Sequence, residues 1–165
     1  MKNLILLRHA KSSWKDPYLS DHDRPLNKRG KRDAPIMADI LKKHFPRPDR
    51  ILASTSKRTR TTAEVMANVL GIDNAEIEYD RNIYHAYAFT LMHIAGDLEP
   101  ELNTVLLIGH NPGLTILANM YLPGISDNIP TCGLLGFRTS LDSWGAFLTK
   151  EEIVCYGKYY PKLLS

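Results

Sequence analysis

The sequence has few cysteines and no long hydrophobic run. Cys132 and Cys155 are its only cysteines, and their spacing fits neither a disulfide framework nor a zinc site. The longest aliphatic runs are four residues long. A membrane span needs roughly 20 apolar residues and a signal-peptide core about 7 to 15. We therefore expect a cytoplasmic protein with no membrane-bound part.

A strong charge of one sign is also missing. The 165 residues are 44% hydrophobic and 24% charged, with a formal net charge of +3. These values predict one globular domain over residues 1–165 and exclude a disordered or fibrous chain. The basic residues cluster at 24–32 and 57–60, without the interleaved aromatics of a nucleic-acid surface. Such clusters are usually solvated helix faces, but they suit an anionic ligand if they converge.

Short aliphatic runs predict strands that are covered on both faces, as in a parallel sheet. The three clearest runs are Leu4–Leu7, Arg50–Ala53 and Val105–Ile108, and residues 75–79 form a weaker one. Residues 131–160 predict two or three further short strands with a turn at 140–143.

Helical patterns lie between the strands, at residues 28–45, 56–70, 87–98 and 112–121. Asn27 is a suitable N-cap for the first helix, whose apolar face includes Ile36 and Leu41. Pro35 requires that this helix either begin near residue 33 or bend at the proline, and we favour the bend. Gly71 is placed to end the second helix.

Strands that alternate with helices predict a three-layer α/β/α sandwich with a mostly parallel central sheet. Ligands of such sheets bind beyond the carboxyl ends of the strands. His9 and His110 each follow a predicted strand, and Ser54 and Arg58 follow a third. These side chains are therefore expected at one edge of the sheet.

The residue types at this edge favour phosphoryl chemistry. Arg8 adjoins His9, so two imidazoles and two guanidiniums would converge, and such a cluster suits a bound dianion. Arginine offers a planar fork of donors for phosphate oxygens, and a neutral imidazole can attack phosphorus.

At these residues the sequence resembles the histidine phosphatase superfamily, whose fold is also called phosphoglycerate mutase-like. Leu7-Arg8-His9-Ala10 is similar to its Arg-His-Gly motif. Ser54 and Arg58, followed by Thr62-Ala63-Glu64, resemble its second motif, and Gly109-His110-Asn111-Pro112 resembles its distal histidine motif. Arg24-Pro25-Leu26 resembles the segment before the first helix. The motifs at 8–14 and 110–113 are most similar to the short SixA-type phosphohistidine phosphatases, which have no cap domain.

The resemblance implies a role for each residue. His9 would be the nucleophile that forms a transient phosphohistidine, and Arg8, Arg58 and His110 would bind the phosphoryl oxygens and stabilise the transition state. Arg24 would either add a contact to the substrate or form a surface salt bridge with Asp21 or Asp23. Ser54 would either hydrogen-bond within the pocket or begin the turn, and we favour the turn. The mechanism implies no metal ion and no cofactor.

Two departures from the family pattern stand out. Ala10 replaces a glycine, and a methyl group there would shift the following turn if space is short. No general acid for an alcohol leaving group is evident; by residue type alone the options are Asp16, Glu78 and Asp80, with His85 a further one near the rim. Protonated phosphohistidine loses a neutral imidazole and needs less acid catalysis, so this absence favours a phosphohistidine substrate.

The expected function is therefore a phosphatase that acts on phosphohistidine in a protein partner, with no nucleic acid or membrane involved. A general phosphatase for small phosphomonoesters is the alternative. A non-catalytic phosphate-binding regulatory protein is a third interpretation, which the presence of both histidines and both arginines disfavours.

Overall fold

A six-stranded mixed sheet forms the centre of the molecule. The structure is a computed structural model that describes residues 1–161. The strands are β1 (Lys2–Arg8), β2 (Arg50–Ala53), β3 (Glu78–Tyr79), β4 (Thr104–Gly109), β5 (Leu134–Thr139) and β6 (Ile153–Tyr159). Their order across the sheet is β3-β2-β4-β1-β5-β6. β1 to β4 are parallel, and β5 is antiparallel to both of its neighbours, β1 and β6.

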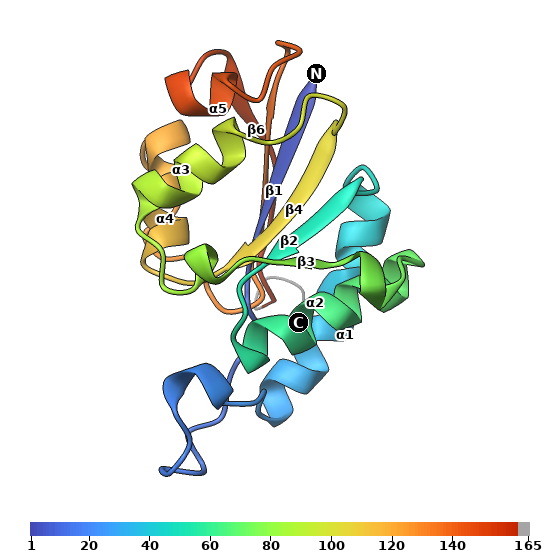
Figure 1. Cartoon of the computed structure of the whole chain (residues 1–165), viewed down its shortest axis with the longest axis vertical. Helices are drawn as coiled ribbons and strands as arrows, with labels where there is room; N and C mark the ends of the chain where they lie inside the picture. The colour runs from blue at the N-terminus through green and yellow to red at the C-terminus, as the bar shows by residue number, and fades with distance from the viewer. Residues whose placement is uncertain (162–165) are drawn as a thin grey trace.

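Helices cover both faces of this sheet (Figure 1). One face carries α1 (Lys28–His44) and α2 (Lys57–Leu70), and the other carries α3 (Ala88–Gly96), α4 (Gly113–Tyr121) and the short α5 (Ala146–Thr149). Each face has its own apolar layer, and the two central strands β1 and β4 contribute side chains alternately to both. The expected α/β sandwich with a largely parallel sheet is therefore confirmed.

The four expected helices are present, with one error in the predicted core. α1 runs through Pro35 as one helix, and the Asn27 side chain caps it by accepting a hydrogen bond from the Gly30 amide at 2.9 Å. Ile36, which the pattern placed on the apolar face, is exposed. α2 ends at Gly71, which has φ 70°, a left-handed conformation that costs glycine little.

Two short elements differ from the expectation. The weak strand expected at 75–79 is reduced to the two residues of β3, which follow a 3₁₀ turn at Asn74–Glu76. The last segment forms the two strands β5 and β6, and the connection between them contains α5, which the sequence pattern did not predict. No helix in the described residues 1–161 is both long and apolar enough to cross a membrane.

Candidate active site

The two strand-end histidines lie side by side. β1 and β4 are neighbours in parallel register, with Arg8 opposite Gly109, so the next residue of each strand emerges at the same edge. The His9 and His110 rings are 5.1 Å apart between centroids, and their residues are only 7% and 3% exposed. The expectation of one shared edge is correct for this pair.

His9 is held in a defined tautomer. Its Nδ1 lies 2.8 Å from the Ala10 carbonyl oxygen, which can only accept, so Nδ1 carries the proton. Nε2 is then unprotonated and accepts a long hydrogen bond from Arg58 Nε at 3.4 Å. Burial, together with the cationic Arg58, Arg8 and Arg24, lowers the pKa of His9 to about 3, against the opposing effect of the Ala10 hydrogen bond. His9 is therefore a neutral imidazole at neutral pH, and its unprotonated Nε2 is held only by the long hydrogen bond from Arg58.

His110 is neutral for the same reasons. Burial and the nearby His9, Arg58 and His85 lower its pKa to about 2. Its Nδ1 accepts from Arg58 Nη2 at 3.5 Å, so the proton lies on Nε2, which donates to Ser54 Oγ at 2.7 Å. Ser54 thus hydrogen-bonds within the site, and our preference for a turn-starting role alone was wrong.

Arg58 is the centre of the hydrogen-bond network. It lies in the first turn of α2 and is 3% exposed. Besides the two histidines, its guanidinium donates from Nη1 to the Asp21 carbonyl at 2.6 Å and from Nη2 to Asp21 Oδ2 at 3.0 Å. The loop before α1 is therefore tied to the start of α2 through this side chain.

Arg8 borders the same pocket from the end of β1. Its Nη1 donates to the Ile129 carbonyl at 2.9 Å, while its Nε atom is buried and finds no hydrogen-bond partner within residues 1–161. Burial, and then the neighbouring Arg58, lowers the pKa of Arg8. A buried N–H donor without an acceptor is costly.

Arg24 forms the salt bridge to an aspartate that the sequence offered as one alternative, but it does so at the pocket and not at the surface. It is 6% exposed and lines the pocket, and its Nη1 forms a salt bridge with Asp21 Oδ1 at 2.8 Å. Its Nη2 donates to Ser12 Oγ, and its guanidinium stacks on the Trp14 ring 3.3 Å from the centroid. Arg24 is thus buried at the pocket rather than on the open surface.

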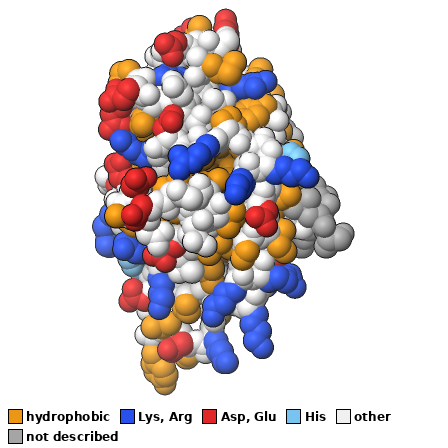
Figure 2. Space-filling view, turned by 90° about the vertical axis from the view of Figure 1, so that its right-hand side faces the viewer, with side chains coloured by type: hydrophobic (Ala, Val, Ile, Leu, Met, Phe, Trp, Pro, Cys, Tyr) orange, Lys and Arg blue, Asp and Glu red, His pale blue; other side chains and the backbone are white. Residues whose placement is uncertain are grey.

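Together these residues enclose a small pocket of about 210 Å³. Its lining contains four cationic side chains and one carboxylate, that of Asp21. Further Lys and Arg side chains gather on the lower part of the α1–α2 face, the end at which α1 begins (Figure 2). The exposed Lys28 and Lys31 belong to this end. The pocket is suited to an oxyanion with more than one negative charge.

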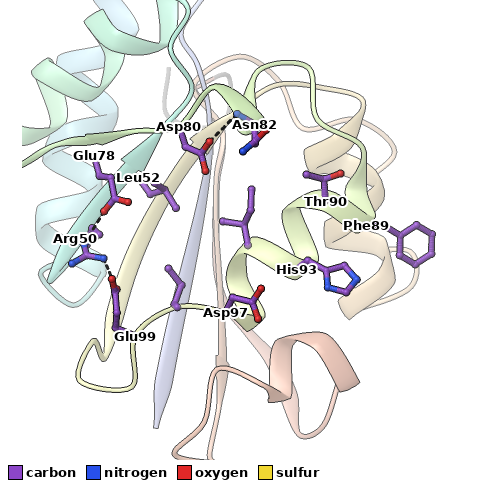
Figure 3. Close-up of a pocket in the computed structure, with 12 residues that line it drawn as sticks. Arg50, Leu52, Glu78, Asp80, Asn82, Phe89, Thr90, His93, Asp97 and Glu99 are labelled. Carbon is purple, nitrogen blue, oxygen red and sulfur yellow. Dashed lines mark hydrogen bonds and ion pairs between the residues drawn. The ribbon is translucent and has the colours of Figure 1, made fainter.

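A larger hollow of about 540 Å³ lies elsewhere, between β2 and α3 (Figure 3). Its one arginine, Arg50, is already paired with Glu78 and Glu99. Asp80 also lines it and accepts a hydrogen bond from the Asn82 amide at 2.8 Å. Glu78 and Asp80 both line this hollow and not the pocket of His9 and His110, so they are not positioned to donate a proton there.

Of the four residues that the sequence offered as a general acid, only His85 lines the pocket of His9 and His110. Asp16 is exposed and accepts from the Tyr18 amide in the loop before α1. His85 has φ 49°, unusual for a residue other than glycine, and its Nε2 lies 3.2 Å from Arg58 Nη2.

Asp21 and Tyr84 are the residues that sequence reasoning missed. Tyr84 donates its hydroxyl hydrogen to Asp21 Oδ2, and its ring packs edge-on against His110 with centroids 5.4 Å apart. Asp21 was considered only as a surface partner of Arg24. The one sequence signal for it is its position three residues before the matched Arg-Pro-Leu segment.

Comparisons with known proteins show the family to which the chain belongs. The model of the histidine phosphatase superfamily (branch 1) matches residues 4–84. An uncharacterized chloroplastic protein of Arabidopsis thaliana is 38% identical over 151 residues, which are 87% of this chain and 69% of that protein. An uncharacterized protein of Mycobacterium tuberculosis is 33% identical over 144 residues, which are 81% of this chain and 87% of the relative.

Solved structures share the fold over most of the chain. SixA of Agrobacterium tumefaciens, described as a candidate phosphohistidine phosphatase, is 32% identical with a TM-score of 0.76, covering 84% of this chain and 92% of its own. A protein histidine phosphatase SixA complexed with tungstate superposes with a TM-score of 0.81 over 99% of both chains. At 20% identity, this second likeness shows the fold alone.

Proposed function

Because this chain belongs to the histidine phosphatase superfamily, and to its SixA-type branch, we propose that it transfers a phosphoryl group to His9 and then to water. The single observation that carries this proposal is the state of His9. Its Nε2 is unprotonated and accepts only a long hydrogen bond from Arg58, and three arginines and His110 line the same pocket. Hydrolysis through a covalent intermediate needs this combination of a positioned nucleophile and cationic donors.

In the first step, the Nε2 lone pair of His9 attacks phosphorus as the bond from phosphorus to the leaving group breaks. The phosphorylated imidazole becomes cationic and keeps its Nδ1 proton, whose hydrogen bond to the Ala10 carbonyl, 2.8 Å long, fixes the ring. In the second step, water attacks phosphorus, the P–Nε2 bond breaks, and its electron pair returns to Nε2. Both protons of the water leave with inorganic phosphate.

The neighbouring side chains stabilise the charge that develops on the phosphoryl oxygens. Arg58 and the unpartnered Nε of Arg8 supply charged donors. His110 supplies a neutral donor when its Nε2 hydrogen turns from Ser54 to an oxygen of the substrate. Arg24 reaches the same pocket and adds positive charge.

We propose phosphohistidine in a protein as the substrate. The one carboxylate that lines the pocket, that of Asp21, is ionised, so it brings no proton for an alkoxide leaving group. A protonated phosphohistidine needs none. The rim is also exposed, since the side chain of His85 is 51% and residue Trp14 72% exposed. The SixA name of the Agrobacterium relative supports the same substrate class.

Hydrolysis of small phosphomonoesters is the second candidate. The His85 imidazole favours it, because its Nε2 lies 3.3 Å from Asp21 Oδ2 at the pocket and an imidazole can donate a proton to an alcohol leaving group.

A substrate panel tests the proposal. The purified chain is assayed with a phosphohistidine-bearing protein and with alkyl and sugar phosphates at matched concentrations. We expect a higher kcat/KM for the phosphohistidine protein than for any unactivated alkyl phosphate. Faster hydrolysis of an alkyl phosphate would favour the second candidate, and no hydrolysis of any compound would reject both.

A further inference from the structure

The carboxylate of Asp21 lines the pocket that contains His9 and His110. Asp21, in the 3₁₀ turn Asp21–Asp23, accepts hydrogen bonds from Arg24 Nη1 at 2.8 Å, from Arg58 Nη2 at 3.0 Å and from the Tyr84 hydroxyl. Its own carbonyl oxygen accepts from Arg58 Nη1 at 2.6 Å. Both terminal nitrogens of Arg58 therefore donate to Asp21, and Nη2 also contacts His85 and His110.

These contacts resemble those expected for a bound phosphoryl group. A planar guanidinium that donates through both terminal nitrogens is the usual partner of a carboxylate or a phosphate. The remaining Arg58 donor, Nε, faces His9. A phosphoryl group placed for attack by His9 Nε2 must therefore share or take over donors that Asp21 now occupies.

The carboxylate is charged in the free protein. Burial acts to raise the pKa of Asp21, but hydrogen bonds from Tyr84, Arg58 and Arg24 outweigh it and hold the pKa well below its usual range. Its negative charge offsets part of the positive charge of the pocket and repels a second anion.

We propose that Asp21 is an internal anion that competes with the phosphoryl group for Arg58 and so limits how tightly phosphate binds. This inference rests on the proposed function, since it concerns the pocket in which that reaction would occur. Asp21 is then a positioning residue: it holds Arg58 and Arg24 in place before phosphate binds and weakens the binding of the phosphate product, which favours its release.

The test measures binding of inorganic phosphate by titration calorimetry at constant ionic strength. The variants Asp21→Asn and Asp21→Ser remove the charge, and Asp21→Glu retains it. Asp23→Asn is the matched control, because this carboxylate lies in the same turn, has a side chain that is 67% exposed and contacts His22 rather than an arginine. We expect Asp21→Asn and Asp21→Ser to bind phosphate at least ~10-fold more tightly than the native protein. Asp21→Glu should bind it much as the native protein does, and Asp23→Asn within about twofold of it.

A merely structural role of Asp21 predicts that the neutral variants do not bind phosphate more tightly. If Asp21 only keeps the arginines in place, both neutral variants bind phosphate equally or more weakly, and that result overturns the proposal. Thermal unfolding of each variant shows that it is folded. The binding assay needs no turnover, so a native protein that hydrolyses nothing would reject the proposed function without affecting this test. In an active protein, the phosphate inhibition constant should fall by the same factor as the dissociation constant.

Discussion

Because the fold keeps His9 and His110 neutral, the free energy of unfolding depends on pH. An unfolded histidine has a pKa near 6.5, whereas the folded values are about 3 for His9 and about 2 for His110. Between these values the unfolded chain binds more protons than the folded protein, so folding stability rises with pH and is lost as pH falls below about 6.5.

We therefore predict that, below about pH 5.5 and down to about pH 4.5, the free energy of unfolding decreases by about 1.4 kcal/mol for each unit that the pH falls and for each of the two histidines. Urea denaturation in a phosphate-free buffer series measures this slope. In each of the variants His9→Gln and His110→Gln, the slope should be smaller by the contribution of the histidine that was replaced. Equal slopes in the native protein and both variants would mean that the two imidazoles are not held neutral by the fold.

Arg58 and His110 should contribute to turnover through charge stabilisation. We predict that Arg58→Ala and His110→Ala each lower kcat/KM at least ~100-fold, the effect of losing one donor aimed at the developing charge. Lys57→Ala is a matched control, since Lys57 is an exposed cation next to Arg58 on α2. Steady-state kinetics would contradict these roles if either pocket variant kept more than a tenth of the native kcat/KM.

The strand and helix pattern explains how the pocket residues meet. The aliphatic runs of β1, β2 and β4 are buried on both faces, so composition alone predicted them, and parallel strands bring His9 and His110 to one edge. β3 has only two residues and α5 only four, which is too short for a periodic pattern. Ile36 was misplaced because it adjoins the apolar stripe of α1 yet faces solvent.

The motifs that resemble those of the family were recognisable because each is a short run of residues beside a strand or helix end. Asp21 was not, since its role depends on Arg58 and Tyr84, which lie 37 and 63 residues away along the chain. A local sequence pattern cannot predict contacts between residues so far apart. Because Asp21 and Asp23 lie close to Arg24 in the sequence, a surface salt bridge was the simpler interpretation.

The junction between α1 and the loop after β1 supports the pocket wall. A Cβ atom on Gly30 would lie 2.2 Å from the Lys11 carbonyl oxygen, and the Asn27 amide donates to that same oxygen at 2.9 Å. Ser12 and Trp14, which follow Lys11, line the pocket. The Lys11 backbone thus packs directly against Gly30, and no space remains there for a side chain.

Gly30→Ala is therefore predicted to destabilise the protein by about 1–3 kcal/mol and to lower kcat/KM. Helix propensity alone predicts the opposite sign, a gain of about 0.5–1 kcal/mol. Chemical denaturation distinguishes the two, with the exposed Lys31→Ala as a control in the same turn. A stabilised Gly30→Ala protein would show that the loop tolerates displacement.

At the scale of the whole molecule, the pocket offers no protonated carboxylic acid to the leaving group. The rate of phosphate ester hydrolysis should therefore depend on the basicity of the leaving group. We predict a steep negative slope when log(kcat/KM) for aryl and alkyl phosphates is plotted against leaving-group pKa, provided that the chemical step limits the rate. His85→Gln should leave the slope unchanged. A flat plot with fast alkyl phosphate hydrolysis that becomes steep in His85→Gln would identify His85 as a general acid.

The central claim is that the phosphoryl group is carried on His9, and trapping that intermediate tests it most directly. The native protein is mixed with a substrate carrying radioactive phosphate, stopped in alkali within milliseconds, and analysed for protein-bound label that is stable to alkali and released by acid. We predict such label on His9 in the native protein, and neither label nor turnover in His9→Ala, because no other residue replaces a positioned nucleophile. Turnover in His9→Ala close to the native rate, or label on another residue, would contradict the account.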